Sequence, residues 1–391
     1  MGRVLLVVGT RPEVIKMAPV FHALRAHTPD LESRIAFTGQ HTTLVDSVMG
    51  AFDLVPDFDL AIMKSDQSLS DVIAAAAQGL TRVIREFQPH ILLVQGDTAT
   101  VFAASLAGFL ERVPVGHVEA GLRSGDKDAP WPEEVFRRMT DVIADLYFAP
   151  TPGARELLLA ENVPAGSIHV TGNTVVDALL TVAGHRHSVT NRALSDVLYS
   201  GDHRRLILLT AHRREAFGAP LERIFAAVRQ IVEAHPDVHV VYPVHPNPSV
   251  RGPAHAALGG ITRVHLTEPL DYVDTVVAME RAALILTDSG GIQEEAPTFG
   301  TPVLVLRDVT ERPEGIEAGV ARLVGTDIEL IVSGAKDALS RSRVGGLNPY
   351  GDGRAAVRIA DVVASVLLGR PRETSDWSGH SAATVAGRPA P

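Results

Sequence analysis

Four side chains that could move protons lie at the ends of short apolar runs or in the loops that follow them. Asp97 and Glu119 come after two such runs, Glu133 lies in the loop beyond Glu119, and His212 follows a later run. Carboxylates gathered at one site suit proton transfer on and off a carbon or a leaving oxygen. Each residue alone is weak evidence, because a carboxylate after a strand is more often a turn or cap residue. Their shared placement at strand ends favours a catalytic role.

Two turns could hold an anion. The turn 9–13 carries Arg11, with Lys16 one helical turn later, and no G-x-G-x-x-G follows this first apolar run. That pattern argues against a dinucleotide fingerprint and favours cations aimed at an anion. The second turn, 288–291, contains two glycines that allow the backbone to approach phosphate at a helix start. The alternatives are solvated helix charges in the first turn and a simple helix cap in the second.

Strand and helix patterns alternate along the chain and position these residues. Continuous apolar runs at 4–8, 91–95, 206–210 and 282–287 are typical of buried parallel strands. We therefore predict an α/β fold with two Rossmann-like, doubly wound domains facing a cleft. The expected organisation is an N-terminal catalytic domain (1–173), a C-terminal ligand-binding domain (174–354), a helix packing back on the first domain (355–368) and a disordered tail (369–391).

Composition excludes several classes of protein. The chain has 391 residues, a net charge of −10 and no cysteine, so disulfides, thiolate catalysis and cysteine-built zinc sites are excluded. No long basic block indicates a nucleic-acid partner. No apolar stretch approaches a membrane span, and the run 4–8 is too short for a signal peptide, so we expect a cytoplasmic protein. His185 and His187 lack a further ligand at metal spacing, and we expect no metal.

The chain resembles the non-hydrolysing UDP-N-acetylglucosamine 2-epimerases, which have a glycosyltransferase-B-like fold. The resemblance spans roughly residues 1–368 in family order, and no single motif carries it. The matching motifs are 9–13 (GTRPE) with Lys16, 96–98 (GDT), 117–123 (HVEAGLR), 130–134 (PWPEE), 171–174 (TGNT), 212–215 (HRRE), 242–245 (YPVH), 287–295 (TDSGGIQEE), 310–314 (TERPE) and 348–353 (NPYGDG).

The resemblance implies an isomerase that converts UDP-N-acetylglucosamine to UDP-N-acetylmannosamine without metal or nicotinamide. Anti elimination of UDP would give a 2-acetamidoglucal, and re-addition of UDP would complete inversion at C2. Asp97, Glu119 and Glu133 would together handle the C2 proton, and His212 would stabilise or protonate the departing UDP oxygen. The resemblance also implies a homodimer. The pathway that uses the product stays open among surface polysaccharide, cell-wall polymer and secondary metabolite, that is, polysaccharide or antibiotic sugar biosynthesis.

The same resemblance assigns the nucleotide contacts. Arg11 and Lys16 would neutralise diphosphate charge as UDP leaves, and Glu295 would accept from the ribose hydroxyl pair. The full expected UDP-binding set is Arg11, Lys16, His212, Ser289, Gly290, Gly291, Glu295 and Arg312.

Some positions depart from the family pattern. Phe136 stands before Arg137 where the family commonly has Asn. A second, regulatory UDP-N-acetylglucosamine site would involve Gln40, His41, Gln67, Glu134, Arg213 and His245. Its usual basic neighbours correspond to Thr42 and Asp66 here, and losing two cations beside a diphosphate weakens such a site. We therefore expect weak or absent allosteric activation.

Three alternatives share parts of this pattern. A hydrolysing 2-epimerase would release UDP and free N-acetylmannosamine after the same elimination. A glycosyltransferase of the same fold would bind UDP at the same turn but would need an acceptor site. A binding-only sensor of UDP-sugars would have no need of Asp97, Glu119, Glu133 and His212.

Overall fold

The computed structural model describes residues 1–27, 29–39, 43–64, 66–185, 187–199, 204–310, 312–341, 343 and 348–379. The chain divides into two compact units. One holds Met1–Thr181 together with the returning segment from Tyr350, and the other holds Val182–Pro349. Both are parallel α/β units, which confirms the predicted pair of doubly wound folds.

The first unit is built on a seven-stranded sheet in the order β3-β2-β1-β4-β5-β6-β7, and all its pairings are parallel. The order reverses between β1 and β4, so the turns that leave these two strands lie side by side at the carboxyl edge. The strands are β1 (Gly2–Val8), β2 (Leu31–Phe37), β3 (Phe58–Asp59), β4 (Ile91–Gln95), β5 (Val115–Val118), β6 (Leu146–Ala149) and β7 (Ile168–Val170).

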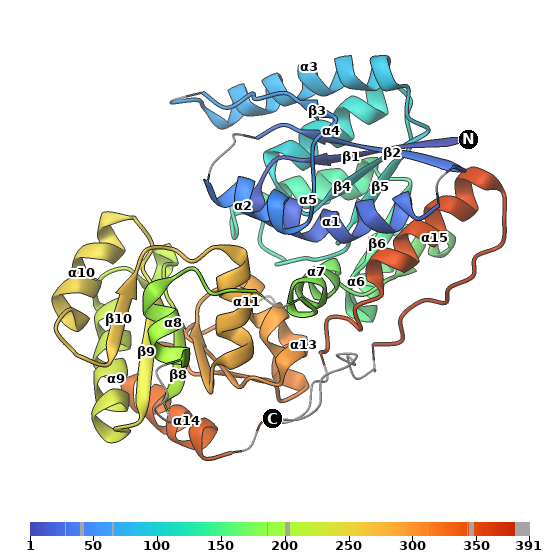
Figure 1. Ribbon diagram of the computed structural model, residues 1–391. Helices are drawn as coiled ribbons and strands as arrows, with labels where there is room; N and C mark the ends of the chain where they lie inside the picture. The colour runs from blue at the N-terminus through green and yellow to red at the C-terminus, as the bar shows by residue number, and fades with distance from the viewer. Residues whose placement is uncertain are drawn as a thin grey trace. The chain divides into compact units, whose positions relative to one another are not determined.

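Helices cover both faces of this sheet (Figure 1). On one face α3 packs against α4 and α4 against α5, and on the other α1 packs against α2 and α15. Helix α3 begins with a capping box between Ser68 and Asp71, which satisfies two end groups of the backbone. The helices are α1 (Arg11–Arg25), α2 (Thr43–Ala51), α3 (Leu69–Phe87), α4 (Ala99–Leu110), α5 (Glu133–Ile143), α6 (Pro152–Ala160), α7 (Thr174–Ala183) and α15 (Ala355–Leu368), with a 3₁₀ turn at Ala165–Ser167.

The second unit has a six-stranded parallel sheet in the order β10-β9-β8-β11-β12-β13. Its order reverses between β8 and β11, which again places two turns together. The strands are β8 (Arg205–Thr210), β9 (Val238–Pro243), β10 (Val264–Thr267), β11 (Leu284–Thr287), β12 (Val303–Val305) and β13 (Ala321–Leu323). The helices are α8 (Arg192–Tyr199), α9 (Ala219–Ala234), α10 (Pro248–Leu258), α11 (Tyr272–Arg281), α12 (Gly290–Glu295), α13 (Pro313–Glu317) and α14 (Ile328–Ser340), with 3₁₀ turns at Arg214–Ala216 and Ala296–Phe299.

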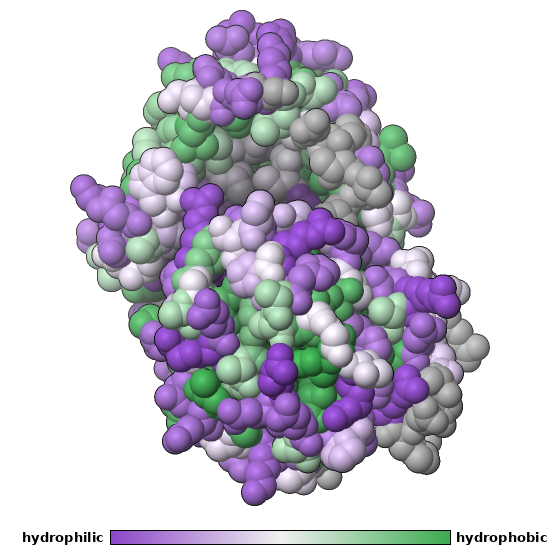
Figure 2. Space-filling model, turned by 90° about the vertical axis from the view of Figure 1, so that its left-hand side faces the viewer, coloured by the Kyte–Doolittle hydropathy of each residue, from purple (hydrophilic) through white to green (hydrophobic). Residues whose placement is uncertain are grey.

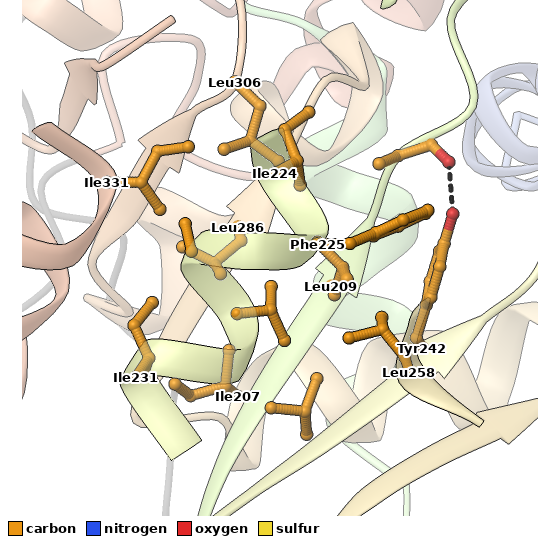
Figure 3. Packing of buried hydrophobic residues seen from close by; sticks show 14 of the residues in the cluster. Ile207, Leu209, Ile224, Phe225, Ile231, Tyr242, Leu258, Leu286, Leu306 and Ile331 are labelled. Carbon is orange, nitrogen blue, oxygen red and sulfur yellow. Dashed lines mark hydrogen bonds between the residues drawn. The ribbon is translucent and has the colours of Figure 1, made fainter. Parts of the chain in front are cut away.

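A dry core fixes the second sheet against α9, α10 and α14. Ile207, Leu209 and Leu286 point from the sheet toward Ile224 and Phe225 of α9 (Figure 3). On the face drawn in Figure 2, by contrast, hydrophilic residues surround smaller hydrophobic areas. Within the described ranges, no helix combines the length and apolar character needed to cross a membrane.

The compact units divide at residues 181/182 and 349/350, whereas the sequence predicts boundaries at 173/174 and 354/355. Helix α7 was expected to open the second domain, but the first unit extends to Thr181, and Asp177 of α7 accepts hydrogen bonds from the backbone N–H groups of Ala355 and Ala356 at 3.2 and 2.8 Å. Helix α15 lies beside α1 in the same unit (Figure 1).

The segment expected to be a disordered tail is ordered up to residue 379. Trp377 is only 4% exposed, and its backbone N–H donates to the Val170 carbonyl of β7 at 2.7 Å. The Asp376 carboxylate accepts from the Val170 backbone N–H. Asp361 of α15 also accepts from the N–H groups of Glu373 and Thr374. One buried tryptophan and these backbone contacts hold the segment in place although its composition, poor in large apolar residues, predicts disorder. Positions 380–391 lie outside the described residues.

Candidate functional site

The first group of predicted residues gathers where β1, β4 and β5 end. Lys16 of α1 reaches Glu119, which follows β5, and its Nζ lies 2.8 and 2.6 Å from the two carboxylate oxygens. The Gln95 side-chain amide donates to the same carboxylate. Both ends of the ion pair are largely buried, with 13% and 8% of the side chains exposed. Glu119 is therefore held by two donors, one from α1 and one from the end of β4.

The backbone at Glu119 is itself unusual. Its φ of +70° lies in the left-handed region, which non-glycine residues rarely adopt. Such a conformation costs on the order of 1–3 kcal/mol and is found mainly at functional sites, where surrounding contacts enforce it. Here the Glu119 N–H donates to the Phe148 carbonyl of β6 at 3.0 Å. This turn aims the carboxylate at Lys16 instead of continuing the strand.

Asp97 has a cation of its own. Gly96, with φ +85°, turns the chain after β4, and the Arg137 guanidinium of α5 donates to Asp97 through Nε at 3.1 Å and also through Nη2. Arg137 also contacts the fully buried Glu134 at 3.2 Å. Asp97 keeps 29% of its side chain exposed. Two carboxylates on adjacent strand ends thus each have a cation at hydrogen-bond distance.

Glu13 lies beneath these turns. Its carboxylate accepts from the Gly9 N–H at 2.6 Å, the Thr10 hydroxyl at 2.9 Å and the Thr98 hydroxyl at 2.7 Å. It is 2% exposed, and burial raises its pKa to about 7 even though the hydrogen bonds act in the opposite direction. The sequence analysis quoted Glu13 within a motif but gave it no role.

A second buried network supports the β4 and β5 ends. His117 of β5 has Nδ1 2.6 Å from Asp141 and Nε2 2.8 Å from the Gly96 carbonyl. The ring thus bridges the Asp141 carboxylate and the turn that follows β4. Arg123 lies 2.8 Å from the other oxygen of Asp141. Burial acts to raise the pKa of Asp141, but His117 and Arg123 outweigh it and the pKa is lowered.

In the second unit, Asp288 organises the end of β8. This fully buried carboxylate accepts from the backbone N–H groups of His212 and Arg213 at 2.6 and 2.7 Å. Its other oxygen lies 3.5 Å from Nδ1 of His212. The ring also stacks on His245 with centroids 5.5 Å apart. Tyr242 holds the same turn by donating to the Ala211 carbonyl at 2.6 Å (Figure 3), and burial raises the pKa of its phenol.

The glycine turn after β11 packs against Arg312. Ser289 is the N-cap of α12, but its side chain makes no capping hydrogen bond. A Cβ added at Gly290 would lie 2.6 Å from the Arg312 guanidinium carbon, so glycine is required for this close approach. Arg312 Nε donates to Glu294 at 2.7 Å. The structure therefore brings a guanidinium to the turn that the sequence marked as an anion site.

Other expected site residues lie outside these hydrogen-bonded groups. Arg11 begins α1, and Glu133 begins α5; both are half-buried. Glu295 is 7% exposed at the end of α12. Gly291 has open space around its Cα, because an added Cβ would meet only the Ser289 hydroxyl at 3.9 Å.

The structure describes four of the expected regulatory residues: Gln67 and Glu134 in the first unit, and Arg213 and His245 in the second. Gln40, His41 and Thr42 lie outside the described residues, while Gln67 bonds locally to Lys64 and Ile62. Both oxygens of buried Glu134 accept hydrogen bonds, from Ser124, Arg137 and Arg138. Asp66 is exposed. The Glu134 carboxylate thus accepts hydrogen bonds from three residues of its own unit.

Phe136, the departure from the family pattern, has a packing role. It is 8% exposed and stacks on Phe102 of α4 with ring centroids 5.5 Å apart and an interplanar angle of 3°. The aromatic pair fills the contact between α4 and α5, and its neighbour Arg137 reaches Asp97.

The structure identifies supporting residues that the sequence analysis assigned no role. These are Glu13, Gln95, His117, Arg137, Asp141 and Glu294; Asp288 had been noted only as the start of a turn. Most of them lie within or next to the motifs that carry the family resemblance, and this position is the sequence signal that could have identified them. Across the described part of the chain, no group of three or more His, Asp or Glu side chains could hold a metal ion.

Comparisons with known proteins agree with this architecture. The family model described as UDP-N-acetylglucosamine 2-epimerase matches residues 22–364. The UDP-N-acetylglucosamine 2-epimerase of Bacillus subtilis (strain 168) is 50% identical over 366 residues, which cover 92% of this chain and 94% of the relative. An S. aureus co-structure with UDP has a TM-score of 0.87 at 44% identity, covering 97% of this chain and all of that one. A UDP-GlcNAc 2-epimerase from Neisseria meningitidis, bound to UDP-GlcNAc, has a TM-score of 0.83 at 40% identity, covering 94% and 100%.

Proposed function

The chain belongs to the UDP-N-acetylglucosamine 2-epimerase family, and from this premise we propose that it interconverts UDP-N-acetylglucosamine and UDP-N-acetylmannosamine without hydrolysing them. The observation that carries the proposal is the pair of carboxylate–cation contacts, Glu119 with Lys16 and Asp97 with Arg137, at adjacent strand ends. Proton transfer at carbon needs such positioned carboxylates, and expulsion of a diphosphate needs nearby positive charge.

The proposed reaction has two halves. In the first, a carboxylate removes the C2 proton, the C–H electron pair forms the C1=C2 double bond, and the C1–O bond breaks to release UDP. In the second, the UDP oxygen attacks C1 and a proton is delivered to C2 on the opposite face. No net oxidation occurs, and no cofactor is needed.

Two proton-handling groups are required because the proton leaves one face and returns to the other. We assign them collectively to Asp97, Glu119 and Glu133. The Lys16 ammonium beside Glu119 adds positive charge where UDP departs, and Arg11 contributes in the same way. Charge that develops on the leaving diphosphate strengthens these contacts in the transition state, which favours catalysis over ground-state binding.

The second unit would hold UDP. Ser289, Gly290 and Gly291 would donate to phosphate, Arg312 would add charge at the same turn, and His212 would stabilise or protonate the departing oxygen. Support comes from the close approach of Arg312 to Gly290 and from the Asp288 carboxylate, which bonds the backbone of His212. Glu295 would accept from the ribose hydroxyls. A solved S. aureus relative has UDP bound, which supports UDP as the ligand.

The products of one incubation test the proposal. UDP-N-acetylglucosamine and the protein alone should yield UDP-N-acetylmannosamine, separable by NMR or anion-exchange chromatography. Free N-acetylmannosamine with UDP would instead indicate the hydrolysing reaction. No turnover unless a sugar acceptor is added would indicate a glycosyltransferase, and binding without any turnover would indicate a sensor.

Allosteric activation by UDP-N-acetylglucosamine should be weak or absent, because Thr42 and Asp66 replace two basic neighbours of the regulatory site. A reaction started with pure UDP-N-acetylmannosamine should then begin without delay. A lag that traces of UDP-N-acetylglucosamine abolish would contradict this. Homodimer formation, a cytoplasmic location and a role in polysaccharide or antibiotic sugar biosynthesis complete the proposal.

A further inference from the structure

Glu13 connects two turns that are far apart in sequence. Through Gly9 and Thr10 its carboxylate holds the turn between β1 and α1, and through Thr98 it holds the turn between β4 and α4. The first of these turns leads directly to Arg11, and the second carries Asp97. A carboxylate has two oxygens that can accept all three donors at once, which a hydroxyl or a single carbonyl could not do.

We propose that Glu13 is a positioning residue, which sets Arg11 and Asp97 relative to one another by bonding the two turns that carry them. This inference rests on the proposed function, because it concerns how the diphosphate-binding and proton-handling groups are aligned. Glu13 is 2% exposed, and we assign its effect to the turns that its carboxylate bonds. Misplacement of a reacting group by about 1 Å can cost roughly 100-fold in rate.

The surroundings of Glu13 are uncharged. Its hydrogen-bond partners are an amide and two hydroxyls, and Gly9 also lies against the hydroxyls of Thr38, which follows β2, and Thr100 of α4. Two charged side chains near these turns form ion pairs with other residues: Lys16 pairs with Glu119, and Asp97 pairs with Arg137. Arg11 is the remaining charged group on the first turn.

The carboxylate form suits the three donors, because protonation would turn one acceptor oxygen into a donor. Burial raises the pKa of Glu13 to about 7, so this change falls in the range where activity is measured. The alignment of the turns should therefore improve as pH rises through about 7. The kcat/KM of the enzyme should therefore also rise with pH through this range.

The test compares Glu13→Gln with Asp177→Asn. Asp177 is also a buried acid whose pKa burial raises to about 7, but it bonds Ala355 and Ala356 and contacts neither turn. We expect E13Q to lower kcat/KM about 10- to 100-fold and to remove an inflection near pH 7 from the profile of kcat/KM. D177N should retain the wild-type profile and kcat.

Thr10→Val provides a second variant, because it removes one donor without altering the buried carboxyl group. T10V should lower kcat/KM less than E13Q, and T10V/E13Q should be no worse than E13Q, since both act through one contact. An E13Q enzyme with the same kcat/KM and pH profile as D177N, or additive effects of T10V and E13Q, would overturn the inference. Wild-type protein without epimerase activity would instead refute the proposed function.

Discussion

Lys16 and Glu119, 103 residues apart in sequence, form a largely buried ion pair in which the ammonium contacts both carboxylate oxygens. The sequence analysis gave them separate tasks: Lys16 was to neutralise diphosphate and Glu119 was to handle a proton. The pair joins the two tasks. In the proposed reaction, a cation that moves toward the departing UDP would weaken its contact with Glu119.

Replacing Lys16 with Met should therefore affect both activity and stability. We expect kcat to fall by on the order of 10²–10³, comparable to losing one oxyanion donor, and the free energy of unfolding to fall by about 3 kcal/mol because Glu119 is left buried without its cation. Steady-state kinetics and urea denaturation measure the two effects. Lys16→Arg, which keeps the charge, is the control, and K16M kinetics equal to those of K16R would contradict the coupling.

Arg137 and Arg138 offer a matched pair of variants. Both contact Glu134, but only Arg137 reaches Asp97, and Arg138 is 43% exposed. Arg137→Gln should lower kcat/KM by about 100-fold, since a positioned charge contact of this kind contributes roughly 3 kcal/mol. Arg138→Gln should stay within about threefold of wild type, in line with the small contribution of exposed ion pairs. Equal losses in the two variants would show that Glu134, and not Asp97, is the partner that matters.

Much of this architecture follows from the sequence. Apolar runs followed by polar or glycine residues predicted the strand ends at which Asp97, Glu119 and His212 stand, and parallel sheets bring such ends to one edge. The ion pairs could not be predicted in this way. Periodicity reports burial and secondary structure, whereas Lys16–Glu119 depends on which helix face meets which strand end.

The ordered C-terminal segment shows a second limit. Its composition is poor in apolar residues, so it predicts disorder. A single Trp377, buried beside β7, and the backbone contacts of Asp361 and Val170 order it as far as residue 379. Composition averages over a segment and cannot register one anchoring side chain.

The two glycines of the turn 288–291, which we propose binds UDP, should respond differently to alanine. At Gly290 a Cβ would meet the Arg312 guanidinium at 2.6 Å, whereas at Gly291 it would meet only the Ser289 hydroxyl at 3.9 Å. Gly290→Ala should displace Arg312 from the turn and weaken UDP binding about tenfold, roughly the effect of losing one charge-assisted contact. Gly291→Ala should bind within about twofold of wild type. Isothermal titration with UDP separates the two, and unchanged affinity in G290A would argue against a role for Arg312.

Stability should fall as pH rises from about 4.5 to 7. Burial raises the pKa of Glu13 and of Asp177 to about 7, so the folded state holds both protons more tightly than the unfolded state. Their stabilising contribution is complete below their unfolded values and is lost by about pH 7, at about 1.4 kcal/mol per pH unit for each group. The pKa of Asp141 is lowered, so its stabilising contribution is lost only as the pH falls below this range.

Urea denaturation between pH 5 and 8 measures this dependence. The free energy of unfolding of wild type should decline to about pH 7 and then level. E13Q/D177N should show a much flatter profile over the same range. A double variant that keeps the wild-type slope would assign the dependence to other groups.

The central claim is that carboxylates of the first unit exchange the C2 proton while UDP leaves and returns. Incubation of the protein with UDP-N-acetylglucosamine in D2O, followed by NMR, tests it most directly. We expect deuterium at C2 of accumulating UDP-N-acetylmannosamine, and no such incorporation with Asp97→Asn. UDP-N-acetylmannosamine that forms with C2 still fully protonated would contradict it.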